Sequence, residues 1–154
     1  MTTTAACGSA ASAPNAALEQ SPAGLEQTRV TIHSKTGKHR FTVEVAHTPE
    51  QQAQGLMFRQ SLDPNRGMLF PRNPPGDASF WMKDTLIPLD IIFVRPDDTI
   101  VRIVSGVPMS LDPIPSLEPV AAVLEIPGGR AAELGIREGD RVDWPHPPAD
   151  RREG

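Results

Sequence analysis

Apolar and polar residues alternate in two neighbouring segments of the chain, "RVTIHS" (29–34) and "RFTVEVA" (40–46). A period of two is typical of strands with one buried and one solvated face. The segment between them, "KTGK" (35–38), has the composition of a tight turn. The pattern therefore predicts a β-hairpin with one face in solvent.

Helix signals occur at two places. In "TPEQQAQGL" (48–56), Thr48 can cap a helix, Gln51 completes a capping box and Gly55 marks the end. The second signal, "GGRAAELG" (128–135), predicts one or two turns closed by a glycine.

The other apolar runs are short and separated by turn residues. "LDIIFV" (89–94) is continuously apolar apart from its Asp, which predicts a strand covered on both faces. "PRNPPGD" (71–77) is expected to be a loop, and "ASFWM" (78–82) a strand. About six or seven short strands with two short helices indicate a mostly β (α+β) fold, a small closed or nearly closed β-barrel-like domain. A parallel α/β sheet is disfavoured because it needs more crossover helices.

The 154 residues suit one domain, with 29–144 predicted to be globular. Residues 1–28 are poor in apolar side chains and are expected to form a disordered leader, and 145–154 a disordered tail. The net charge of −4 and the lack of a basic stripe argue against nucleic acid as a partner. No apolar run approaches the roughly 18–20 residues of a transmembrane helix.

The single cysteine excludes an internal disulfide. Cys7 stands in "AACGS", which resembles the end of a bacterial lipoprotein signal. This interpretation predicts a lipid anchor at Cys7 and a periplasmic or cell-envelope location. The alternative is an incidental cysteine in an Ala/Ser/Pro-rich leader.

Three charged residues stand within apolar segments: Arg59 follows "GLMF", Lys83 follows "FWM", and Asp90 divides "IPL" from "IIF". Burying a charge is costly unless it is paired. The three are therefore expected to pair with one another or with a ligand. An Arg59–Asp90 or Lys83–Asp90 ion pair that only ties segments together is an equal alternative.

Two further hypotheses concern chemistry. Lys83 with Asp84 or Asp90 could supply the acid and base of a hydrolase or lyase. Met57, Met68 and Met82 each stand beside an aromatic residue and could bind Cu(I), although core packing explains them more simply. No zinc spacing or nucleophile motif is present in the sequence, and no cofactor is predicted.

Four motifs together resemble the uncharacterised family known as domain of unknown function 192: "GLMFR", "GMLF", "FWMKDTLIPLDIIFV" and "VLEIPGGRAAELGIREGDRV". The resemblance spans about Gly55 to Val142 and implies a small, mostly β domain. Family members often follow an export or lipoprotein signal, in line with the interpretation of Cys7. The family usually has Asn where this chain has Asp84, which puts a role for an amide donor there in doubt.

These observations predict a non-enzymatic binding domain that holds a small polar or anionic ligand, or a protein partner. The expected surface is formed around Arg59, Trp81 and Lys83. The predicted site comprises Arg59, Trp81, Lys83, Asp84, Asp90, Met57 and Met68. Asp90 is expected to accept hydrogen bonds from backbone amides, Arg59 or Lys83.

Overall fold

A computed structural model describes residues 18–147, which form nine strands and two short helices. The elements are β1 (Gln27–Ser34), β2 (Gly37–Val45), α1 (Pro49–Gln54), β3 (Arg66–Gly76), β4 (Ser79–Phe80), β5 (Leu89–Val94), β6 (Ile100–Gly106), β7 (Ile114–Pro115), β8 (Val120–Pro127), α2 (Arg130–Leu134) and β9 (Arg141–Asp143). The prediction of a mostly β domain with two short helices is confirmed.

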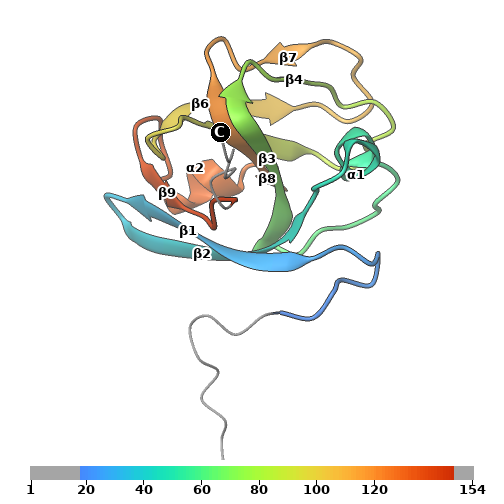
Figure 1. Cartoon of the computed structure of the whole chain (residues 1–154), viewed down its shortest axis with the longest axis horizontal. Helices are drawn as coiled ribbons and strands as arrows, with labels where there is room; N and C mark the ends of the chain where they lie inside the picture. The colour runs from blue at the N-terminus through green and yellow to red at the C-terminus, as the bar shows by residue number, and fades with distance from the viewer. Residues whose placement is uncertain (1–17, 148–154) are drawn as a thin grey trace, which may run out of the picture.

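Seven strands form one strongly curved sheet in the order β6-β5-β8-β3-β2-β1-β9, and β4 pairs with β7 in a separate ribbon (Figure 1). Within the described residues, β2 and β3 are the one parallel pair. The sheet does not close into a barrel. Its edge strands approach each other at one end, where a single bridge joins Thr99 to Arg141. The barrel-like expectation is thus met only loosely.

Apolar residues fill both faces of the sheet. One face packs with α2 around Phe41, Leu124 and Trp144. The other packs around Met68, Phe70 and the segments that lead into and out of β4. All six residues of β5 are buried, as the continuous apolar run predicted.

The predicted capping box begins α1. The Thr48 hydroxyl accepts a hydrogen bond from the Gln51 amide at 3.1 Å, and the Gln51 side chain accepts one from the Thr48 amide at 3.2 Å. Gly55 ends the helix with φ 49°, a conformation that favours glycine. At this point the chain passes over the Phe70 ring, so the short helix lies against β3.

Two local predictions are only partly confirmed. "PRNPPGD" is not simply a loop, because β3 continues to Gly76 with an irregular register between Pro71 and Gly76 against β8. This irregularity lets prolines, which lack an amide hydrogen, stay in a strand. The predicted strand "ASFWM" is reduced to Ser79–Phe80.

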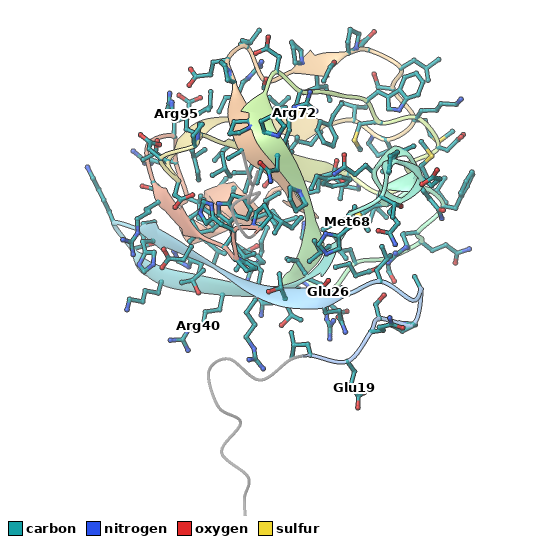
Figure 2. All side chains as sticks on the ribbon, in the orientation of Figure 1. Glu19, Glu26, Arg40, Met68, Arg72 and Arg95 are labelled. Atoms are coloured by element: carbon teal, nitrogen blue, oxygen red, sulfur yellow. The ribbon has the colours of Figure 1, made fainter. Side chains whose placement is uncertain are left out.

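The described domain also includes residues that the sequence pattern places in the leader and tail. Ser21 is buried and donates a hydrogen bond to Glu44 at 3.0 Å. His146 stacks on Trp144 with ring centroids 4.0 Å apart. Arg40, in contrast, projects from the outer face of the hairpin (Figure 2). Cys7 lies outside the described residues, and none of the described helices is long and apolar enough to cross a membrane.

Candidate functional site

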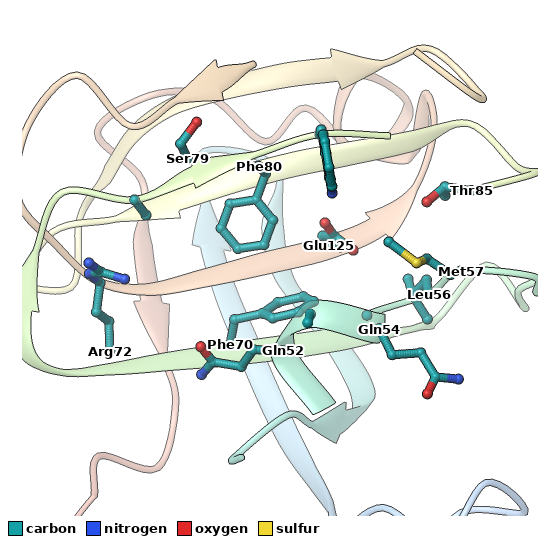
Figure 3. Close-up of a pocket in the computed structure, with 14 residues that line it drawn as sticks. Gln52, Gln54, Leu56, Met57, Phe70, Arg72, Ser79, Phe80, Thr85 and Glu125 are labelled. Atoms are coloured by element: carbon teal, nitrogen blue, oxygen red, sulfur yellow. The ribbon is translucent and has the colours of Figure 1, made fainter. Parts of the chain in front are cut away.

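A cavity of about 280 Å³ opens between α1, β3, β4 and β8 (Figure 3). Its walls combine apolar and aromatic side chains with several polar ones. The lining residues that matter here are Gln52, Met57, Phe70, Arg72, Phe80, Trp81, Thr85 and Glu125. A concave surface that combines aromatic and apolar side chains with a few convergent polar groups is typical of small-molecule sites.

Glu125 provides the one carboxyl group among the residues that line this cavity. It lies in the middle of β8, between Met68 on β3 and Ile91 on β5 in the sheet register, and is only 4% exposed. Among the described residues, none donates a hydrogen bond to its side chain. Burial therefore raises the pKa of Glu125 to about 8. The acid is largely protonated at neutral pH when the cavity is empty.

Aromatic rings surround this carboxyl group. Phe70 and Phe80 meet edge to face, with centroids 5.0 Å apart and an interplanar angle of 81°. Figure 3 shows the Glu125 carboxyl group among Phe70, Phe80 and Met57. Trp81 also lines the cavity but is half exposed, and the Lys83 ammonium lies 5.2 Å from its ring centroid.

Other polar groups of the lining are partly used within the protein. The Gln52 side-chain amide donates to the carbonyl groups of Ala46 and Pro71, at 3.1 and 3.0 Å, which leaves its own carbonyl oxygen available as an acceptor. The Arg72 guanidinium lies at the opposite end of the cavity from Met57 (Figure 3) and forms no ion pair with any described residue. The site thus holds acceptors near its centre and one cation toward its rim.

Of the predicted site residues, Trp81 and Met57 line this cavity. Asp90 is directed elsewhere. Its two carboxylate oxygens accept hydrogen bonds from the amides of Gly129, at 3.1 Å, and Ala131, at 2.9 Å. The prediction that backbone amides satisfy the buried Asp90 is confirmed, but they belong to the start of α2 rather than to the cavity.

Arg59 does not pair with Asp90, so that predicted ion pair is wrong. Its guanidinium forms a two-pronged interaction with Glu44, at 2.7 and 2.9 Å. Burial alone would raise the pKa of Glu44, but the hydrogen bonds and charge of Arg59 outweigh it and lower the pKa. The hydrogen bond from Arg59 to Glu44 in turn raises the pKa of Arg59. The pair is already satisfied without a ligand.

The acid–base set suggested from the sequence is not assembled. Lys83 is exposed and forms no ion pair with any described residue, and Asp90 is occupied at α2. Asp84 has φ 53°, and its carbonyl group accepts a hydrogen bond from the Phe58 amide at 2.9 Å. Asn and Asp tolerate this left-handed conformation best among non-glycine residues. The left-handed backbone conformation therefore explains why either Asp or Asn suits position 84.

The three methionines of the Cu(I) hypothesis occupy different environments. Met68 and Met82 are 0% and 1% exposed and pack inside the core, whereas Met57 lines the cavity. Core packing, the simpler interpretation, fits the two buried side chains.

Sequence reasoning missed Glu125, although the signal was available. A lone carboxylate interrupts the apolar run "VAAVLEI", as Asp90 interrupts "IPLDIIFV". Asp90 stands out because it lies near Trp81 and Lys83 in the sequence. Glu125 lies far from Trp81 in the sequence and comes close to it only through the folding of the sheet.

The fold and cavity define a small, mostly β domain with an aromatic-walled pocket over a buried acid. The family described as DUF192, Uncharacterized ACR, matches residues 30–144, and the chain belongs to this family. No curated protein is significantly similar to the chain.

Two solved structures are similar over most of the chain. A protein of unknown function from Novosphingobium aromaticivorans is 48% identical, with a TM-score of 0.82, and the match covers 85% of this chain and 95% of that one. A protein described as a putative transcription regulator, from Sinorhizobium meliloti, is 41% identical, with a TM-score of 0.75 and coverage of 77% and 94%. Neither similarity supplies an activity for this chain.

All four motifs that carried the family resemblance contribute to the cavity. "GLMFR" contributes Met57, "GMLF" contributes Phe70, "FWMKDT" contributes Trp81 and Thr85, and "VLEI" contributes Glu125. Segments far apart in the sequence thus meet at one site.

Proposed function

We propose that this domain binds a small molecule in the cavity between α1 and β8, with Glu125 as the polar group that orients it. The observation that carries this proposal is a nearly buried carboxyl group that faces a cavity and has no hydrogen-bond partner among the described residues. The Glu125 oxygens keep some exposure to the cavity, because no fully buried side-chain oxygen among the described residues lacks a partner, but removing a carboxyl group from most of its water without a hydrogen-bond partner still costs free energy. A bound ligand that donates to Glu125 would remove this cost.

The size and lining of the cavity restrict the ligand. A volume of about 280 Å³ lies just below the usual range for small-molecule sites, roughly 300–1,000 Å³, so the ligand must be small. The aromatic rings of Phe70, Phe80 and Trp81 favour a compact ligand with an apolar or planar surface. The anionic ligand considered from Arg59 and Lys83 is less favoured, because Arg59 already binds Glu44.

The description of the Sinorhizobium protein as a putative transcription regulator raises the question of DNA binding, which the charge of this chain does not support. DNA affinity depends on basic residues that neutralise phosphates. This chain carries a net charge of −4. A transcriptional role in which the domain senses a small molecule, without itself contacting DNA, would be compatible with the cavity.

A fragment screen monitored by two-dimensional NMR tests the proposal. We expect some fragments to shift the Trp81 indole N–H and the amides around Glu125. Glu125→Gln should alter these shifts, whereas Glu138→Gln, at an exposed acid away from the cavity, should leave them unchanged. A diverse library that shifts no resonance of the cavity residues would contradict the proposal.

The envelope location predicted from Cys7 is a second, separate part of the proposed function. Cells that produce the protein should retain it in the membrane fraction, and Cys7→Ser should release it. Equal distribution of both forms would leave the incidental-cysteine interpretation.

A further inference from the structure

We infer that the ligand of this cavity is a small organic cation, an alkyl- or methyl-substituted ammonium held between the aromatic rings with Glu125 as its counter-ion. This inference rests on the proposed function, because it names the ligand class of the same cavity. It is carried by the chemistry of the lining rather than by any single group.

The surroundings of Glu125 provide acceptors and apolar groups rather than positive charge. Its strand neighbours Met68 and Ile91 are apolar, and α1 contributes neutral residues to the lining. Gln52 has its amide hydrogens engaged and presents an oxygen. Arg72, the one cation of the lining, lies at the rim and is exposed to solvent, which screens its charge.

The aromatic walls add a second attraction for a cation. The faces of Trp and Phe rings carry negative potential and bind ammonium groups, with a larger effect where water is excluded. Phe70 and Phe80 stand nearly perpendicular to each other, at 81°, so they present surfaces in two directions. The Lys83 ammonium lies over the Trp81 ring at 5.2 Å, so Phe70 and Phe80, rather than this face of the indole, are left for a ligand cation.

A bound cation also changes the protonation state of Glu125. Burial keeps Glu125 protonated at neutral pH in the empty cavity. A cation next to the carboxylate stabilises its ionised form. Binding therefore releases a proton at neutral pH, and the cation should bind more tightly as the pH rises toward 8, the range in which Glu125 loses its proton unaided.

Three probes of the same shape separate charge from size: tert-butylammonium, tert-butanol and pivalate. Titrations followed by NMR on the whole chain should show the ammonium binding roughly tenfold or more tightly than the alcohol, with pivalate weakest. Tetramethylammonium, which has no N–H, distinguishes the contribution of the rings from that of hydrogen bonding. Either ammonium binding more tightly than tert-butanol supports the inference.

Glu125→Gln should weaken tert-butylammonium binding by roughly tenfold and remove its pH dependence, while changing tert-butanol binding much less. Glu138→Gln serves as the matched control and should behave like the wild type. Equal binding of alcohol and ammonium, or tighter binding of pivalate, would overturn the cation class but leave the proposed function standing. Absence of binding by both ammonium probes also rejects the inference, and the broader fragment screen then decides the proposed function separately.

Discussion

Glu44 and Glu125 lie in one row across the sheet, on either side of Met68 and on the same face. Two strand spacings separate them, about 10 Å. Glu44 is neutralised by Arg59 and accepts a hydrogen bond from Ser21, whereas no described residue bonds to the Glu125 side chain. Their pKa values consequently move in opposite directions. The same residue type therefore serves structure at one end of the row and, in our proposal, binding at the other.

Glu125→Gln should change how stability depends on pH. The pKa of Glu125 is raised from 4.5 to about 8 on folding, so its carboxyl group favours the folded state fully below about pH 4.5. That contribution is lost as the pH rises toward 8. The neutral amide avoids this loss, so at pH 8 the variant should be more stable by an amount on the order of 4 kcal/mol.

Urea unfolding of both proteins from pH 4.5 to 8.5 measures the effect. Glu138→Gln provides the control for removing an exposed acid. A constant difference between wild type and Glu125→Gln at every pH would contradict the raised pKa.

Arg59→Met should destabilise the protein because it leaves Glu44 buried without the cation that is hydrogen-bonded to it. We expect a loss of roughly 3 kcal/mol in the free energy of unfolding at pH 7. The lowered pKa of Glu44 means that its contribution is present above the ordinary value of 4.5 and is lost as the pH falls below it. The penalty of Arg59→Met should therefore shrink in acid.

A double-mutant cycle with Glu44→Gln isolates this pair. The two single substitutions should be strongly non-additive at pH 7 and less so at pH 3, where less of Glu44 is ionised. Additive effects at both values would mean that the Arg59–Glu44 contact contributes nothing to stability.

Local features were well predicted from the sequence, and long-range ones were not. The α1 capping box, the hairpin and the buried β5 each depend on residues adjacent in the chain. Arg59 could be recognised as a charge that needs a partner, but its partner, Glu44, lies on β2 before α1, and only the folded path of the chain brings the two together. Glu125 was missed for the same reason. Its role follows from a cavity that four separate segments create.

The open sheet also required long-range information. Periodicity predicts strands, but it does not reveal whether the two edge strands of a sheet pair with each other and close it into a barrel. Here the edges meet at one bridge, Thr99 to Arg141, and the sheet stays open.

Gly67→Ala should disrupt the floor of the cavity. A Cβ atom at Gly67 would lie 2.2 Å from the carbonyl oxygen of Glu125, which forces β3 and β8 apart. We expect a loss of roughly 3 kcal/mol in unfolding free energy. Gly76→Ala is the control on the same strand, because its Cβ would meet only the flexible Arg72 side chain, at 3.4 Å. Similar melting temperatures for the two variants would indicate that the strands can separate freely.

Asp90→Ala should be among the more destabilising substitutions, because it removes the acceptor for two amides at the start of α2. Asp90 is 3% exposed, so little water can replace the carboxylate. The expected loss is roughly 3 kcal/mol in unfolding free energy. Asp90→Asn keeps one oxygen acceptor and should therefore lose less unfolding free energy than Asp90→Ala.

Asp84→Ala provides the comparison on the neighbouring loop. The φ of 53° at Asp84 adds a backbone penalty of about 1 kcal/mol for alanine, so a smaller loss is expected there than at Asp90. Asp84→Gly, which adopts this conformation freely, should avoid the penalty, and Asp84→Asn should be close to neutral. Chemical unfolding of all five variants separates the two mechanisms. Equal losses for Asp90→Ala and Asp84→Ala would refute the role of Asp90 as the acceptor that holds α2 against β5.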